Sequence, residues 1–293
     1  MKIAYIGLGV IGAPLAGHLV SAGYDLQVFN RTQSKSDEWS KKFRGQVCTT
    51  PAEACKDVDI AFCCVGDDPD VTQVLLGDNG ALSSLRPGSL FVDHTTTSAA
   101  LARKLYADCY EQEVAFIDAP VSGGEVGAIN GKLTIMCGGR KEDFQRIESI
   151  LQIYARHAQL MGPPGSGQLT KMVNQVCIAG VIQGLAEALI LGQKAGLDME
   201  AVIDVISKGA AQSWQMDNRA KTMLDGEFDF GFAVDWMRKD LRICMEQAGM
   251  LNVEMPVTAL VDSFYAAIQI AGGGRWDTSS LIFRQSSQST KQT

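Results

Sequence analysis

The stretch that decides the fold is Lys2-Ile3-Ala4-Tyr5-Ile6-Gly7-Leu8-Gly9-Val10-Ile11-Gly12, at the start of a 293-residue chain. Residues 2–6 are an apolar run typical of a buried strand, and residues 13–23 have the pattern of an apolar helix. G-x-G-x-x-G between a strand and a helix is typical of a dinucleotide-binding turn. The first glycine permits the tight turn, the second lets the backbone approach a pyrophosphate, and the third permits close helix packing. We therefore expect residues 7–12 to bind a dinucleotide, the alternative being an ordinary glycine-rich turn.

The second expected strand, residues 25–30, ends where the adenosine ribose of such a cofactor would lie. NAD-binding chains usually carry Asp or Glu here, whereas this chain carries Asn30, Arg31 and Thr32. A guanidinium suits a 2′-phosphate, and no carboxylate is present to repel it. We therefore expect NADP(H) to be preferred over NAD(H). The alternative is that Arg31 points into solvent.

Further strands are expected at residues 59–65, 90–93 and 115–118. The loops after the carboxyl ends of parallel strands line the ligand site of an open sheet. Val65 and Gly66 lie at the end of the first of these strands, and Thr96 lies in a polar run after the second. The same polar run is suited to cap the helix expected at residues 99–110.

Ser122-Gly123-Gly124 follows the strand at residues 115–118. A hydroxyl beside the N–H groups of two glycines can form a small anion site, for which a carboxylate is the natural ligand. A short connection across residues 127–131 then leads to a strand at 133–137 and a helix at 141–154.

The pattern changes after Gly167 from alternating strands and helices to helices alone. Residues 169–194 are apolar almost all round, as in a helix buried between subdomains or subunits. The remaining helices are expected at residues 198–207, 213–224, 235–248 and 256–272. We therefore predict an α/β Rossmann domain at residues 1–162 and an all-α substrate and oligomerisation domain at residues 163–293, with a frayed end at 285–293.

Lys171, Asn174 and Gln175 are spaced i, i+3 and i+4 near the start of the long helix. A lysine beside two amides can hold and protonate a carbonyl oxygen, and either amide could be its partner. Trp214 could cap a pocket, although a large aromatic side chain more often belongs to the core. Lys239 and Asp240 are adjacent on a helix, so we expect each to reach a different partner.

The composition excludes several classes of function. The charge of 26 minus 33, or −7, comes without a long basic cluster, so nucleic acid is a poor partner. We see no signal peptide and no apolar run of the ~20 residues that a membrane span needs, and we expect a cytoplasmic protein. The eight cysteines contain no C-x-x-C pair and the three histidines are scattered, which favours reduced core thiols and no metal site.

Taken together, the chain resembles the β-hydroxyacid dehydrogenase family nearly end to end. This family contains 3-hydroxyisobutyrate dehydrogenase, tartronate semialdehyde reductase and the glyoxylate/succinic semialdehyde reductases. The resemblance rests on four segments, at residues 7–12, 118–124, 167–175 and 239–241.

The resemblance implies a role for each of these segments. Lys171 would be the catalytic acid/base, with the amide at 174 or 175 fixing the substrate oxygen. The substrate carboxylate would bind at residues 122–124, Thr96 would lie by the nicotinamide, and Lys239 would close the cofactor site. The chain departs from the usual family pattern in having Gln175 where many members have Asn, in His94-Thr95 where Met-Ser is frequent, and in lacking a proline after Thr97-Ser98-Ala99.

The implied reaction is the NADPH-dependent reduction of a small carboxylated aldehyde, of the tartronate, glyoxylate or succinic semialdehyde type, to its hydroxy acid. One alternative is an oxidative dehydrogenase acting on 3-hydroxyisobutyrate or L-serine, and another is a non-catalytic NADP-binding scaffold. Imine reductases generally lack the lysine, so Lys171 argues against them. The apolar helix and the family both indicate a homodimer or homotetramer.

Overall fold

A computed structural model describes residues 1–289. The chain divides into two compact units, Met1–Lys171 (unit 1) and Met172–Thr293 (unit 2). The predicted boundary between functional domains after residue 162 stays a prediction. We predicted a frayed end at residues 285–293. Residues 285–289 belong to the last helix, and residues 290–293 lie outside the described residues.

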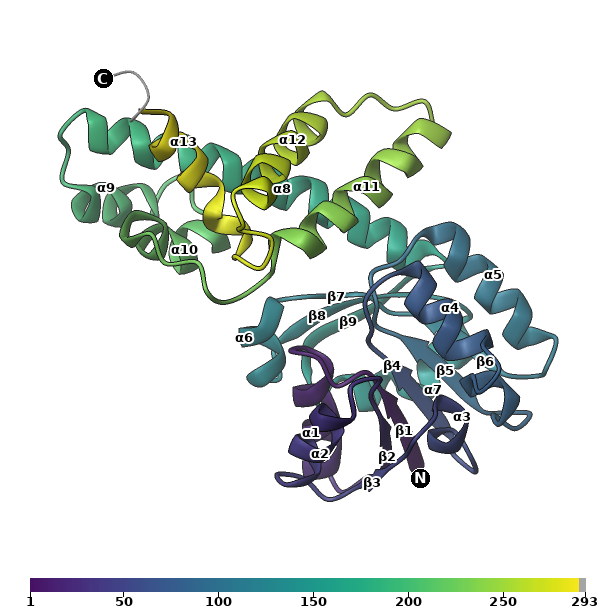
Figure 1. Cartoon of the computed structure of the whole chain (residues 1–293). Coiled ribbons are helices and arrows are strands. Elements are labelled where there is room, and N and C mark those ends of the chain that lie inside the picture. Colours follow the sequence, from purple (N-terminus) through teal and green to yellow (C-terminus); the bar gives the residue numbers. More distant parts are fainter. Residues whose placement is uncertain (290–293) are drawn as a thin grey trace. The chain divides into compact units, whose positions relative to one another are not determined.

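Unit 1 is built on a nine-stranded sheet (Figure 1). Its strands run in the order β3-β2-β1-β4-β5-β6-β8-β7, with β9 also paired to β8. From β3 to β6 the neighbours are parallel, whereas β8 is antiparallel to β6 and β7. The strands are β1 (Lys2–Ile6), β2 (Asp25–Phe29), β3 (Gln46–Val47), β4 (Ile60–Cys63), β5 (Leu90–Asp93), β6 (Ala115–Asp118), β7 (Val121–Ser122), β8 (Leu133–Gly138) and β9 (Ala155–Gly162). This is the strand order of a Rossmann fold and confirms that prediction.

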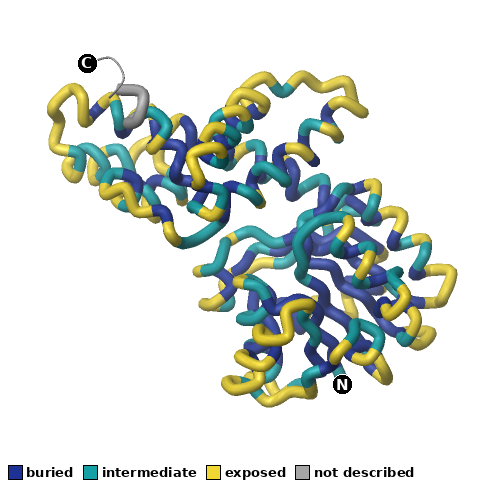
Figure 2. The backbone as a smooth tube through the Cα atoms, in the orientation of Figure 1, coloured by how far each residue is buried: buried dark blue, intermediate teal, exposed yellow. Residues whose placement is uncertain are grey.

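Helices cover both faces of this sheet. They are α1 (Gly12–Ser21), α2 (Gln33–Ser40), α3 (Pro51–Ala54), α4 (Asp68–Leu76), α5 (Ala99–Tyr110), α6 (Gly124–Ile129) and α7 (Lys141–Leu151), with a 3₁₀ turn at Ala81–Ser83. One core contains Leu15 of α1 and Ile147 of α7, and a second core contains Leu75 of α4 and Leu105 of α5. Figure 2 shows the strands between them as mostly buried. Because both faces are covered, the strands read as continuous apolar runs.

Two of the predicted segments in unit 1 differ from the structure. Residues 127–129, expected as the beginning of a connection across residues 127–131, belong to α6, whose last carbonyls at Ala128 and Ile129 accept from His18 Nε2 at 2.9 and 3.1 Å. The helix expected at 141–154 ends at Leu151. The chain turns there, and Tyr154 is fully buried in the core with its hydroxyl 2.9 Å from His94 Nε2.

Unit 2 is all-α, as predicted, and has a core of its own that includes Ile182, Met237 and Tyr265. Its helices are α8 (Ser166–Lys194), which begins in unit 1, then α9 (Met199–Ile206), α10 (Trp214–Asp225), α11 (Val234–Met250), α12 (Pro256–Ile270), a 3₁₀ turn at Thr278–Ser280, and α13 (Leu281–Ser289).

We expected no apolar run long enough to span a membrane. This expectation is wrong, because α8 is long and apolar enough to do so by length and composition alone. The mean hydropathy of its most apolar window is 1.6, and 44% of that window is buried inside the protein. Core helices of soluble proteins share this length and apolar character, so the feature alone is weak support for a membrane span.

Candidate active site

The three glycines of the first turn have different surroundings. Gly7 has a φ of +94°, and a Cβ there would lie 2.1 Å from the carbonyl oxygen of Cys64. A Cβ on Gly12 would lie 2.0 Å from the carbonyl oxygen of Gly7, whereas a Cβ on Gly9 would meet no atom within 4 Å. Packing therefore requires the first and third glycines, and the second leaves open space above the turn, as a dinucleotide-binding turn needs.

The amino end of α1 faces this turn. Among the described residues, no side chain caps the helix, whose N-cap position is Ile11. The first N–H groups of a helix have no partners within it and attract an anion. Leu8 is buried, while Val10 is exposed. The open space at Gly9 and the uncapped helix end fit a pyrophosphate.

Asn30 connects the glycine turn to the end of β2. Its Oδ1 accepts from the N–H of Leu8 at 2.9 Å, and its Nδ2 donates to the carbonyl of Thr32 at 2.9 Å. The Arg31 side chain is 83% exposed and forms an ion pair with Asp70 at 2.7 Å. Exposed pairs of this kind contribute little free energy, so the guanidinium can exchange its partner at small cost.

The loops after β4 and β5 are bonded to each other. The N–H of Val65 donates to Thr95 Oγ1 at 3.0 Å, and the N–H of Thr95 donates to Asp93 Oδ1 at 3.0 Å. Ser98 Oγ accepts from the N–H of Leu101 at 3.0 Å, which confirms that the polar run caps α5. Thr96 is half-buried within this fixed loop, and Gly66 follows Val65 in the loop after β4.

The Ser122-Gly123-Gly124 segment begins on β7, where Ser122 pairs with Thr134 of β8. Gly123 and Gly124 have φ values of +130° and +62°, which side chains rarely adopt, and a Cβ on Gly124 would meet no atom within 4 Å. A Cβ on Gly123 would lie 3.1 Å from the Leu133 side chain, so the open space is at Gly124, close to the half-buried Ser122. This arrangement fits a small anion.

His94 was not among the predicted site residues, yet it bonds to the main chain at Ala119, three residues before Ser122. Its Nδ1 is 2.7 Å from the carbonyl oxygen of Ala119, and its Nε2 is 2.9 Å from the Tyr154 hydroxyl. Burial lowers the pKa of His94 to about 4, so the ring is neutral near pH 7. A neutral ring that donates from Nδ1 to the carbonyl accepts from the Tyr154 hydroxyl at Nε2.

Lys171 is the last residue of unit 1 and is only 7% exposed. It lies on α8, three residues after Gln168, a side chain that the sequence did not single out. Gln168 and Asp118 are both fully buried and together fix the beginning of α8. Their bonds connect residues as far apart as 73 positions, so no local pattern could reveal them.

In unit 2, Gln175 is buried and occupied at both ends of its amide. Its Nε2 donates to Asp240 Oδ2 at 2.6 Å, and its Oε1 accepts from Asn174 Nδ2 at 2.8 Å. Lys239 Nζ lies 3.1 Å from Asp240 Oδ1, so the two neighbours do pair with each other, contrary to the expectation, while Asp240 also reaches a different partner, Gln175, as expected. The flexible four-carbon stem of a lysine lets its ammonium fold back to an adjacent carboxylate.

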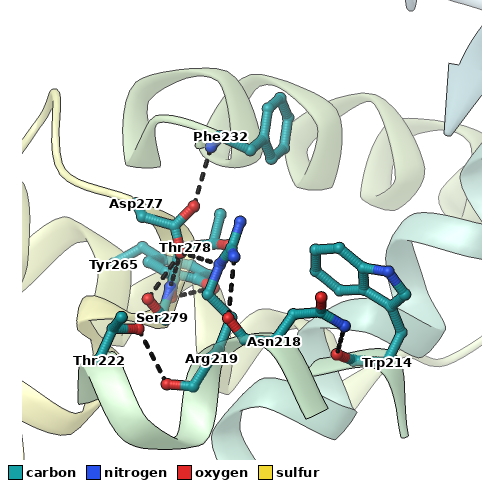
Figure 3. A network of polar contacts seen from close by, with 9 residues as sticks. All are labelled: Trp214, Asn218, Arg219, Thr222, Phe232, Tyr265, Asp277, Thr278 and Ser279. Carbon is teal, nitrogen blue, oxygen red and sulfur yellow. Dashed lines mark hydrogen bonds and ion pairs between the residues drawn. The ribbon is translucent and has the colours of Figure 1, made fainter. Parts of the chain in front are cut away.

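Trp214 begins α10 and is 44% exposed, so it is not part of the core. The Arg219 guanidinium lies 5.0 Å from the centre of its ring and forms an ion pair with Asp277 at 3.1 Å. Figure 3 shows this network, in which Asp277 also accepts from the N–H of Phe232. A half-exposed tryptophan held on a fixed arginine is suited to contact a ligand.

Two family descriptions together match most of the chain. Residues 2–162 match the NAD binding domain of 6-phosphogluconate dehydrogenase. Residues 165–284 match a family described as NAD-binding of NADP-dependent 3-hydroxyisobutyrate dehydrogenase.

Individual relatives match along nearly the whole length. An uncharacterized oxidoreductase of Shewanella frigidimarina is 54% identical, over 97% of both chains. The 2-hydroxy-3-oxopropionate reductase of Escherichia coli is 32% identical, over 96% of both chains. The structure of Mycobacterium tuberculosis 3-hydroxyisobutyrate dehydrogenase with L-serine is similar with a TM-score of 0.87 at 27% identity, covering 96% of this chain and 98% of that one.

Proposed function

Since the chain belongs to the β-hydroxyacid dehydrogenase family of NAD(P)-dependent enzymes acting on CH–OH groups, we propose that it reduces a small carboxylated aldehyde to the hydroxy acid with NADPH. The observation that carries this proposal is the buried Lys171, fixed on α8 within the unit that also contains the glycine turn and the Ser122-Gly123-Gly124 segment. The relative in E. coli is named for an aldehyde of this kind, 2-hydroxy-3-oxopropionate.

The proposed mechanism assigns one task to each group of residues. The hydroxyl of Ser122 and the N–H groups of Gly123 and Gly124 hold the substrate carboxylate. Bound NADPH supplies a hydride to the carbonyl carbon. Lys171 donates a proton to the oxygen that becomes the alcohol, and in the reverse direction it accepts that proton.

We assign the amide that fixes the substrate oxygen to Asn174 rather than to Gln175. Both polar atoms of the Gln175 amide are occupied, one by Asp240 and the other by Asn174 itself. Gln175 therefore supports Asn174, which is half-buried at the preceding position of α8.

The preference for NADP(H) rests on the end of β2. Asn30 presents no negative charge there, and the exposed Arg31 can exchange Asp70 for a 2′-phosphate. Thr96 and Lys239 keep their proposed roles near the nicotinamide, and Trp214 is proposed to line the substrate pocket. Residues 1–162 would bind the cofactor and residues 163–293 would serve substrate binding and oligomerisation.

The proposed assembly is a homodimer or homotetramer in the cytoplasm. Small and apolar residues form an exposed stripe along one side of α8, at Val173, Cys177, Val181, Gly184, Ala188 and Leu191. Leu191 is 72% exposed in the single chain. A second copy of the chain is the partner proposed to cover this stripe.

A panel of substrates tests the proposed function. Tartronate semialdehyde, glyoxylate and succinic semialdehyde are assayed with NADPH and NADH, and 3-hydroxyisobutyrate and L-serine with NADP and NAD. We expect the highest kcat/KM for a semialdehyde with NADPH. A higher value for a hydroxy acid would favour the oxidative dehydrogenase, and NADPH binding without any turnover would favour the non-catalytic scaffold.

A further inference from the structure

Asp118, the last residue of β6, caps a helix that starts far along the chain. Its Oδ1 accepts from the N–H of Gly165 at 2.8 Å, and its Oδ2 accepts from the N–H of Gln168 at 2.9 Å. These N–H groups belong to the start of α8, where no partners exist within the helix. The fully buried carboxylate therefore fixes the beginning of α8 to the edge of the sheet at which β6 ends.

Gly138 and Gly167 pack so closely around this contact that neither position has space for a side chain. A Cβ on Gly138, at the end of β8, would lie 2.5 Å from Asp118 Oδ1 and 2.7 Å from the nitrogen of Gly167. A Cβ on Gly167 would lie 2.4 Å from the carbonyl oxygen of Met136 and 2.7 Å from that of Asp118. Helix α8 thus starts in direct main-chain contact with two strands.

Gln168 makes the second connection, to the loop after β5. Its Oε1 accepts from the N–H of Thr97 at 3.0 Å, and its Nε2 donates to the carbonyl oxygen of Thr95 at 2.8 Å. A side-chain amide is suited to this role because it has an acceptor and a donor together. Both bonds are fully buried, and Thr96 lies between the two residues that are held.

We propose that Asp118 and Gln168 are positioning residues that set Lys171 relative to Thr96 and to the Ser122-Gly123-Gly124 segment. Lys171 is three residues after Gln168, hence about 4.5 Å further along the helix and on nearly the same side. Asp118 begins the chain segment that leads directly to Ser122. The two side chains thus connect the proton donor, the nicotinamide loop and the carboxylate site, and both act only through main-chain atoms. This inference rests on the proposed function of those three parts.

The direct test is Gln168→Glu, assayed at a pH at which the new carboxyl is ionised, so that the variant keeps the size and the acceptor for Thr97 but lacks the donor to Thr95. Misplacing reacting groups by a fraction of an ångström to 1 Å costs up to ~100-fold in rate, so we expect kcat to fall ~10- to 100-fold. NADPH affinity should stay unchanged, because the glycine turn is untouched. With NADPH deuterated at the transferred position, the isotope effect on kcat should rise, because hydride transfer becomes slower than the other steps.

Gln27→Glu is the matched control. Gln27 is another buried glutamine of unit 1, and its Nε2 donates to the carbonyls of Ala54 and Lys56 at 3.1 and 2.9 Å. The control should lower Tm in the same way but leave kcat per folded molecule and the isotope effect unchanged. Wild-type kcat in Gln168→Glu, or equal losses of kcat in both variants, would overturn the inference.

Asp118→Asn gives a second variant if Gln168→Glu does not fold. One oxygen of the asparagine can still accept, while its NH2 group faces an N–H donor of α8. The same fall in kcat with unchanged NADPH affinity is expected, and wild-type kcat would count against the inference.

Failure of the proposed function has a different signature. It would appear as full activity of Lys171→Ala or as an inactive wild type. With an inactive wild type, hydrogen exchange still decides about the connection itself, since Gln168→Leu, which removes the acceptor, should speed exchange at the Thr97 N–H. Unchanged exchange there would overturn the inference in that case as well.

Discussion

The two parts of helix α8 differ sharply although they belong to one continuous helix. Residues 166–171 lie in unit 1, where Gly167 has no free space and Gln168 is bonded to main-chain groups. Residues 172–194 lie in unit 2, where a Cβ on Gly180 or Gly184 would meet no atom within 4 Å and one side of the helix is exposed. Lys171 is therefore the last residue of the part of α8 that belongs to unit 1 and packs against the strand ends. A proton donor at this position directly follows the residues of α8 that are bonded to the sheet and to the loop after β5.

The largest effect on stability is expected from Gly167→Ala. The new Cβ would meet two main-chain carbonyl oxygens, at 2.4 and 2.7 Å, so the start of α8 or the strand ends must move. We expect a loss of about 3 kcal/mol in the free energy of unfolding, measured with urea.

Gly180→Ala is the control for that substitution in the open part of the same helix. Alanine is favoured over glycine by about 0.5–1 kcal/mol inside a helix, so this variant should be more stable than wild type. Equal effects of the two substitutions would remove the contrast between the two parts of α8.

A pH dependence of similar size is expected from Asp118. Burial raises the pKa of its carboxyl from 3.8 to about 6, against the lowering effect of the main-chain N–H groups that bond to it. A carboxyl whose pKa is raised on folding stabilises the fold when protonated, so stability falls as the pH rises through this window. Between pH 4 and pH 7, wild type should lose about 2.4 kcal/mol relative to Asp118→Asn, measured by urea unfolding at both pH values.

The comparison with Asp118→Asn isolates this one carboxyl. Asp93 pairs with Asp118 in register on β5, Cys137 lies on β8, and His94 has a pKa of about 4, but all three are present in both proteins. Parallel stability profiles of the two proteins would show that Asp118 does not titrate in this range.

A smaller effect is expected from Gln175→Leu in the second part of α8. The change removes a hydrogen bond to the buried Asp240 but leaves that carboxylate paired with Lys239. We expect a loss of about 2 kcal/mol in urea unfolding, since a bond to a charged group is removed. Gln193→Leu, at an exposed position of the same helix, should change stability by less than about 0.5 kcal/mol.

The smallest effect on the folded chain is expected from Val181→Glu, on the exposed stripe of α8. An exposed substitution changes the stability of a single chain by about 0.5 kcal/mol or less, yet a charge at this place should separate the subunits. Light scattering after size exclusion should show a smaller species than wild type. An unchanged mass would exclude this stripe as the interface.

Much of the fold could be predicted because its determinants are local. The strands at residues 90–93 and 115–118 and the helix at 99–110 have their predicted bounds, since a sheet covered on both faces gives apolar runs bounded by polar residues. Helix α6 was missed because His18 stabilises its end from a distant segment. The exposed position of Trp214 was equally unreadable, because it depends on Arg219 and Asp277.

The residues of the candidate site also divide into those that a local sequence pattern predicts and those whose roles depend on distant segments. The glycine turn and Lys171 carry spacing patterns that a sequence displays. Asp118 and Gln168 lie in segments on which the family resemblance rests, but their positioning roles could not be predicted, because these roles depend on main-chain groups 47 to 73 residues away. Positioning residues of this kind become visible only when the strand ends are brought together.

The most direct test of the account is the rate of hydride transfer by Lys171→Ala, measured in a single turnover with NADPH and the best semialdehyde of the panel. NADPH binding is measured in parallel by the change in nucleotide fluorescence. We predict a rate ~100- to 10,000-fold below wild type with unchanged NADPH binding, as expected for the loss of a proton donor. A rate equal to that of wild type would contradict the central claim that this buried lysine protonates the substrate.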